Sequence, residues 1–196
     1  MKALGKGSIA SIVRIGLQVA WWGLWLASGL LAAAAVSYGV ILALIASGAM
    51  DPSILEANRD AQVQIPGITL DNPPDIIWPV VVPGMLNAGV AIGGGLVIVG
   101  RLKQLFDNFT SGEPFRRENA SHLRAIWIAM LAIEISRFAL LALAGALLAA
   151  FGPDEIERTV SLSIDISTWA SIFILIVLAE VFREGARLKE EQELTI

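Results

Sequence analysis

Residues 125–151 read AIWIAMLAIEISRFALLALAGALLAAF, and Glu134 and Arg137 are the only charged residues among these 27. A helix that crosses the hydrocarbon core of a bilayer needs about 20 mostly apolar residues. This segment is long enough, and its apolar residues come in blocks rather than with the period of a half-buried surface. It therefore predicts a helix that spans a membrane.

Three further stretches meet the same criterion. They lie at about residues 12–50, at 78–99 with a more polar continuation to 106, and at 167–182 with a charged continuation to 193. Together with a helix at about 118–151, they predict an all-α membrane protein of four transmembrane helices in a single domain, residues 1–196. The composition agrees, because 56% of the chain is apolar and 16% charged, where soluble domains average about 45–50% and about 25%.

Several kinds of site are excluded or disfavoured by composition alone. The chain has no cysteine, which excludes disulfides, thiolate metal sites and thiol nucleophiles, and it has a single histidine, His122. Its net charge of −4 argues against direct nucleic-acid binding. We therefore expect no enzymatic activity, no cofactor and no metal.

The distribution of lysine and arginine predicts the orientation in the membrane. Of 14 basic residues, 11 lie before the first helix, between the second and third, or after the fourth. The two remaining loops hold only Arg59 and Arg158 beside nine acidic residues. Because basic residues are enriched in cytoplasmic loops, both termini are expected to be cytoplasmic.

The loops on the opposite side contain a strand-like pattern. Apolar and polar residues alternate over Ala61–Ile65 and over Thr159–Ile166, which is the period of a half-buried strand. We expect these two segments to pair as a small two-stranded β element, with turns at Pro66-Gly67 and at Asn72–Pro74. A mobile loop is the alternative.

Glu134 and Arg137 lie nine and twelve residues beyond the start of their apolar segment, near the middle of the membrane. Inserting an ionisable side chain at this depth costs about 2.5 to 3.5 kcal/mol of free energy, according to membrane-insertion scales. Three residues apart on a helix, they share a face and can neutralise each other. One interpretation is a structural ion pair hydrogen-bonded to neighbours such as Asn87, Ser37 or Tyr38. Another is an intramembrane polar site, with Asn87, for a lipid headgroup, a quinone-like molecule or a peptide; a third is a proton or ion pathway.

The second apolar stretch is rich in glycine. Gly93, Gly94 and Gly95 lack the lysine and the strand-to-helix context of a phosphate-binding loop. Gly89 and Gly93 have the spacing of small residues that lets membrane helices approach closely. All four glycines are therefore predicted to serve helix packing.

The segments expected in the cytoplasm carry most of the remaining charge. Residues 180–191 place acidic and basic residues three or four apart, which is typical of a solvated helix that pairs its own charges. A docking surface for a protein or for lipid is the alternative. Its residues would be Arg101, Lys103, Phe115, Arg116, Arg117, Glu180, Arg183 and Arg187.

Two of these segments carry a family resemblance. The run Gly112–Phe115 (GEPF) with Asn119-Ala120 after it, and the ending Leu178–Ile196, resemble the bacterial four-helix membrane proteins of domain-of-unknown-function family twenty-nine seventy-five. The resemblance implies a multi-pass protein of the bacterial inner membrane. It also implies a small helix-turn-helix regulator encoded nearby, and no known catalytic residues.

The leading functional hypothesis is a membrane sensor or anchor. It would bind an amphipathic ligand or membrane lipid, and would signal to or sequester a cytoplasmic helix-turn-helix regulator. The alternatives are a small transporter or channel-like protein that uses the Glu134 and Arg137 site, and a structural subunit of a larger membrane complex. Association into a homo-oligomer is a further expectation.

Overall fold

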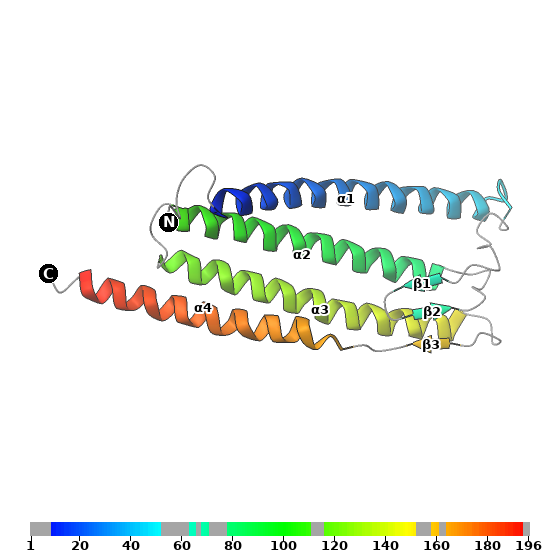
Figure 1. Ribbon diagram of the computed structural model, residues 1–196. Coiled ribbons are helices and arrows are strands. Elements are labelled where there is room, and N and C mark those ends of the chain that lie inside the picture. Colours follow the sequence, from blue (N-terminus) through cyan, green and yellow to red (C-terminus); the bar gives the residue numbers. More distant parts are fainter. Residues whose placement is uncertain are drawn as a thin grey trace. The chain divides into compact units, whose positions relative to one another are not determined.

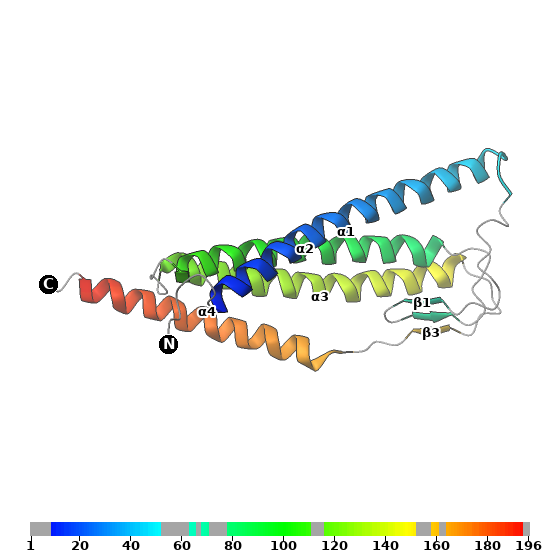
Figure 2. The same ribbon diagram turned by 45° about the horizontal axis from the view of Figure 1, so that its top comes forward.

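The computed structural model describes residues 9–51, 63–65, 68–70, 78–110, 116–151, 158–160 and 164–193. Within these ranges the chain forms four long helices and three short strands (Figure 1). The helices are α1 (Ile9–Ala46), α2 (Trp78–Thr110), α3 (Arg117–Phe151) and α4 (Ile166–Glu193). Each runs as one unbroken helix in both ribbon views (Figures 1 and 2). All four are long and apolar enough to cross a membrane, so the prediction of four spanning segments is confirmed.

The outer faces of these helices are apolar as well. The most apolar window of α1 contains no buried residue, and Val19 and Leu26 are 67% and 66% exposed. In water such a surface would strongly favour aggregation. In a bilayer, lipid covers it, and helices associate through packing and polar contacts instead.

The end of α1 and the start of α4 are determined by local backbone conformation and hydrogen bonds. The apolar pattern of the sequence alone locates these two positions less accurately. Helix α1 ends at Ala46 rather than near Met50, because Gly48 adopts a φ of +73°. Its amide donates to the Ile45 carbonyl at 3.0 Å, which closes the last turn in the way typical of a C-terminal glycine. Helix α4 begins after Asp165, whose carboxylate accepts hydrogen bonds from the Ser167 amide at 3.0 Å and the Thr168 hydroxyl at 2.7 Å.

The strands form a three-stranded antiparallel sheet in the order β1 (Val63–Ile65), β2 (Ile68–Leu70), β3 (Arg158–Val160) (Figure 1). The expected two-stranded element, with residues 61–65 paired directly to 159–166, is therefore wrong. Thr69 of β2 lies between Gln64 and Thr159 in register. The reason is local, since only two residues separate β1 from β2 and a hairpin closes more readily than a long-range pair. The predicted turns at 66–67 and 72–74 lie outside the described residues.

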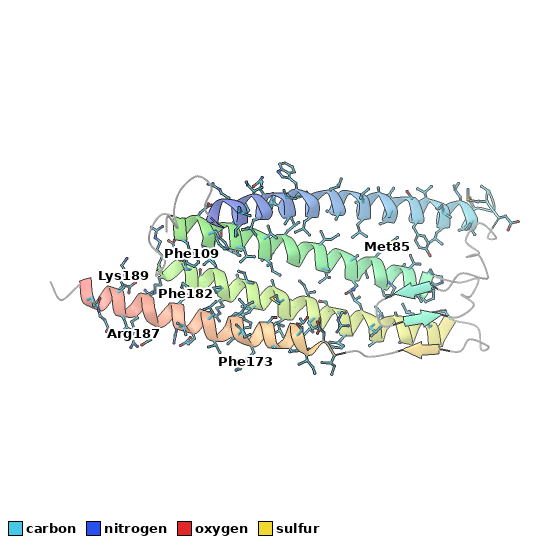
Figure 3. The ribbon with its side chains drawn as sticks, viewed as in Figure 1. Met85, Phe109, Phe173, Phe182, Arg187 and Lys189 are labelled. Atoms are coloured by element: carbon cyan, nitrogen blue, oxygen red, sulfur yellow. The ribbon has the colours of Figure 1, made fainter. Side chains whose placement is uncertain are left out.

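The contacts of the chain fall into two compact units. The first takes the described parts of residues 1–26, 92–133 and 165–196. Its apolar centre joins three helices, with Leu105 of α2, Leu123 of α3 and Ala179 of α4 all buried. Beside it, the rings of Phe109 and Phe182 stack with their centroids 5.9 Å apart (Figure 3). These contacts hold the α2, α3 and α4 segments of this unit together.

The second unit takes the described parts of residues 27–91 and 134–164. Its buried cluster joins Val80 of α2 to Leu141, Ala144 and Leu148 of α3.

Candidate functional site

A charged cleft lies between α3 and α4 in the first unit. Its volume is about 380 Å³, and both helices contribute one stripe of side chains to it. The α3 stripe repeats at intervals of three and four residues, so all its members project from one face of the helix. The lining residues are Arg117, Ala120, Ser121, Arg124 and Trp127 of α3 with Ile176, Ala179, Glu180 and Arg183 of α4.

The size of the side chains explains why a cleft forms here. Ala120 and Ala179 are small and leave space between the two helices. Leu123, next to the stripe on α3, is 2% exposed and packs with Ala179 in the buried cluster described above. The alanines therefore form the floor, and the long arginine side chains form the rim.

The charged side chains on the two walls of the cleft differ in whether they form ion pairs. On α4, Arg183 pairs with Glu180 three residues earlier, and Arg187 pairs with Glu184 at 2.6 Å. On α3, Arg117 and Arg124 have no ion-pair partner among the described residues. The lining therefore carries three guanidinium groups against one carboxylate, an excess of positive charge.

A smaller hollow of about 190 Å³ shares Arg117 and Arg183 with the cleft and extends the charged surface along α4 to Arg187 (Figure 3). In the other direction the lining becomes apolar, with Trp127 and Ile176. Arg124 directly precedes the apolar run of α3. A cleft that is charged at one end and apolar at the other suits an amphipathic anion at the edge of the hydrocarbon region.

The chain matches a family model described as "Protein of unknown function (DUF2975)" over residues 69–196, well over half of its 196 residues. The chain belongs to the DUF2975 family. This confirms the resemblance inferred from the sequence. The comparison with curated proteins and the comparison with solved structures give no match.

The DUF2975 segment contains the whole cleft, together with the Asn119-Ala120 pair that carried part of the resemblance. Asn119 is fully buried, and its side-chain oxygen accepts a hydrogen bond from Asn108 of α2 at 2.7 Å. Ala120 is part of the cleft floor. One residue of the pair therefore ties α3 to α2, and its neighbour lines the site.

The basic residues of the docking surface predicted from the sequence lie in different surroundings, and only some of them line the cleft. Lys103 donates a hydrogen bond to Gln18 of α1 at 2.8 Å and lies over the Trp21 ring, 5.3 Å from its centroid. Arg101 donates to Gln104 on its own helix at 3.3 Å. Neither residue lines the cleft, nor does the exposed Arg116. Phe115 lies outside the described residues.

Of the predicted surface, Arg117, Glu180 and Arg183 meet in the cleft, and Arg187 lies in the hollow beside it. The sequence prediction missed Arg124 as a member of the site. The signal was present, because Arg117 and Arg124 are seven residues apart and so share a helix face. Which helix faces that stripe depends on tertiary packing.

Glu134 and Arg137 form the predicted ion pair, in the second unit. The guanidinium donates from Nε to Oε2 at 3.1 Å and from Nη2 to Oε1 at 2.6 Å, and the Arg137 side chain lies over the Phe138 ring. Glu134 is buried. Among the described residues, no hydrogen bond joins the pair to Asn87, Ser37 or Tyr38.

The four α2 glycines that were predicted to serve helix packing lie in different surroundings. A Cβ on Gly94 would come within 2.5 Å of the Ile133 side chain, and one on Gly95 within 3.2 Å of Leu24. Gly89 meets Leu31 at an ordinary 3.8 Å, and Gly93 has no neighbour within 4 Å. Close helix packing thus requires glycine at Gly94 and favours it at Gly95.

Proposed function

We propose that this DUF2975 protein is a non-enzymatic membrane sensor or anchor whose α3–α4 cleft binds the anionic headgroup of a membrane lipid. One observation carries the proposal. Arg117 and Arg124 project into the same cleft as Arg183, with no ion-pair partner among the described residues. On α4, by contrast, Arg183 pairs with Glu180 and Arg187 pairs with Glu184.

The chemistry of arginine supports a phosphate-bearing ligand. A guanidinium group presents a planar fork of donors that matches two oxygens of a phosphate, and it is less strongly hydrated than an ammonium. Trp127 and Ile176 at the apolar end of the cleft would contact the start of the acyl chains. Tryptophan is enriched at this depth of the bilayer.

We expect Arg117→Gln with Arg124→Gln to weaken binding of an anionic phospholipid at least about tenfold. Hydrogen bonds to charged groups contribute about 1.5–3 kcal/mol each, and tenfold corresponds to 1.4 kcal/mol. Binding is measured by native mass spectrometry of the purified protein with phosphatidylglycerol, and with phosphatidylcholine as the neutral comparison.

The matched control is Arg101→Gln with Lys103→Gln. It removes the same charge from the same unit, where both side chains have partners outside the cleft. Its affinity should stay within about threefold of the natural protein, since only unspecific surface attraction is lost. Equal weakening by both double variants would show attraction to total charge and would overturn the cleft as the site.

The partner half of the proposal rests on the end of α4. Its ion pairs from Glu180 to Glu191 keep it helical, and the exposed Lys189 and Glu190 reach beyond the apolar part of the helix (Figure 3). With both termini in the cytoplasm, as the basic residues predict, this end would meet a helix-turn-helix regulator encoded nearby. Lipid bound in the cleft contacts Arg183 on the same helix and would change the contact with the regulator.

Truncation after Arg187 should abolish capture of that co-expressed regulator and leave membrane insertion unchanged, because the buried Ala186 is retained. A reporter fused to the C-terminus checks the orientation in parallel. Capture that survives truncation would exclude this end of α4 as the docking surface, and a reporter signal from outside the cytoplasm would overturn the partner half altogether.

A further inference from the structure

The hollow beside the α3–α4 cleft contains a carboxylate without a partner. The side chains that line it are those of Arg117, Arg183, Glu184, Arg187 and Glu190. Glu184 pairs with Arg187 at 2.6 Å, and Arg183 pairs with Glu180. Glu190 is exposed and makes no ion pair or hydrogen bond among the described residues. The hollow therefore offers an accessible acceptor beside the unpaired guanidinium group of Arg117.

The charges of the cleft and the hollow limit the net charge of a ligand that occupies both. The two adjoin, because Arg117 and Arg183 line both of them. Together they carry four guanidinium groups against three carboxylates, an excess of one positive charge. A lipid with one net negative charge balances this excess. A second phosphate in the hollow would be repelled by Glu190, and a choline group there has no N–H or O–H to donate to it.

The hollow lies at the depth of the outer part of a lipid headgroup. Glu190 is eight residues beyond Phe182, the end of the apolar part of α4, which is about 12 Å along the helix. Its side chain leans toward the start of the helix, which for α4 is the membrane side. The headgroup layer is about 5–8 Å thick on each side of the hydrocarbon. Arg124, next to the apolar run of α3, lies deeper, at the level expected for the phosphate.

We infer that the hollow recognises an uncharged, hydroxyl-bearing headgroup, and that a hydroxyl of phosphatidylglycerol donates a hydrogen bond to the Glu190 carboxylate. The inference rests on the proposed function, since the phosphate has to occupy the cleft for the headgroup to reach the hollow. A hydroxyl both donates and accepts, so the glycerol group can bind Glu190 and Arg117 together. The volume of 190 Å³ equals that of about six water molecules at about 30 Å³ each, which is enough for a glycerol group.

The test compares phosphatidylglycerol with phosphatidylpropanol of the same acyl chains, by native mass spectrometry and with phosphatidylcholine in parallel. Both anionic lipids carry one negative charge and differ only in the headgroup hydroxyls. The natural protein should bind phosphatidylglycerol about fivefold more tightly, which corresponds to about 1 kcal/mol, the net contribution of one hydrogen bond. Glu190→Ala should remove this preference, and alanine retains the helix at this exposed position.

Two further variants serve as controls. Glu191→Ala removes the same charge from the next residue, which does not line the hollow, so the preference should persist. Arg124→Gln removes a group that lines the cleft but not the hollow. It should weaken binding of both anionic lipids alike and leave their ratio unchanged.

The outcomes separate this inference from the proposed function. Equal binding of the two anionic lipids, with both bound better than phosphatidylcholine, would overturn the inference and leave the cleft as an anion site. If neither were bound better than phosphatidylcholine, the proposed function would fail with it. A preference that persists in Glu190→Ala, or that Glu191→Ala also removes, would show that Glu190 does not bind the hydroxyl.

A measurement on the natural protein decides if Glu190→Ala folds poorly. Carbodiimide labels accessible carboxylates, and Glu190 is exposed. Phosphatidylglycerol should reduce the labelling of Glu190 at least about threefold more than phosphatidylpropanol does. Equal labelling of Glu190 in the two lipids would overturn the inference.

Discussion

Replacing Arg137 with alanine should lower the free energy of unfolding by about 3–5 kcal/mol. The substitution leaves the Glu134 carboxylate, whose side chain is 8% exposed, charged and unpaired inside the membrane-spanning part of α3. Glu134→Ala should cost less, because the Arg137 side chain is 21% exposed and long enough to move its charge toward a more polar region. The double variant should be more stable than Arg137→Ala. Unfolding in mixed micelles measures all three.

The chain offers a matched control for this cycle. Glu180 and Arg183 form a pair with the same spacing, but their side chains are 61% and 67% exposed. Alanine at either position should change stability by at most about 1 kcal/mol, as for other exposed pairs. If both pairs give the same small effect, the Glu134–Arg137 pair is not held in a low-dielectric environment. Additive single effects would equally show that the two residues act independently.

This pair also bears on the transport alternative. The carboxylate and the guanidinium satisfy each other through two hydrogen bonds, so neither presents an open charge to a substrate. Arg117 and Arg124 of the α3–α4 cleft differ in this respect, because neither has an ion-pair partner among the described residues, and the proposed ligand site is therefore placed there.

Two kinds of feature could be predicted from the sequence: those that the bilayer requires and those that depend on the spacing of residues along one helix. A bilayer requires long apolar helices, so the four spans could be counted from the long apolar stretches of the sequence. The ion pair followed from a separation of three residues on one helix. The cleft did not follow, because it depends on the packing of α3 against α4. Lys103 shows the same limit, because it lies near Arg117 in the sequence but donates a hydrogen bond to Gln18 of α1 instead of lining the cleft.

The sheet shows a different limit. Alternation over residues 61–65 and 159–166 overlapped β1 at 63–65 and β3 at 159–160, but the second range ran too far, because α4 begins at Ile166. Strand β2 at Ile68–Leu70 was too short to stand out by its own period. A three-residue strand is recognised only through its partners, and β2 has one on each side.

Adjacent glycines of α2 should respond oppositely to the same substitution. In Gly94→Ala the new methyl group would come within 2.5 Å of Cδ1 and 2.6 Å of Cγ1 of Ile133. Overpacking of this kind costs about 1–3 kcal/mol, because a β-branched side chain has few alternative rotamers. In Gly93→Ala the methyl group meets nothing within 4 Å, so the variant should gain up to about 1 kcal/mol from reduced backbone freedom in the unfolded state.

Thermal unfolding of the two variants in the same detergent measures this difference, and Ile133→Ala provides the decisive background. Once the isoleucine side chain is removed, the contact at Gly94 disappears and Gly94→Ala should behave like Gly93→Ala. If Gly94→Ala stays destabilising in that background, the cost arises from the backbone of α2 and not from its approach to α3. A stabilising Gly94→Ala in the natural background would mean that α2 and α3 are further apart here than the structure places them, and the packing role of Gly94 would be wrong.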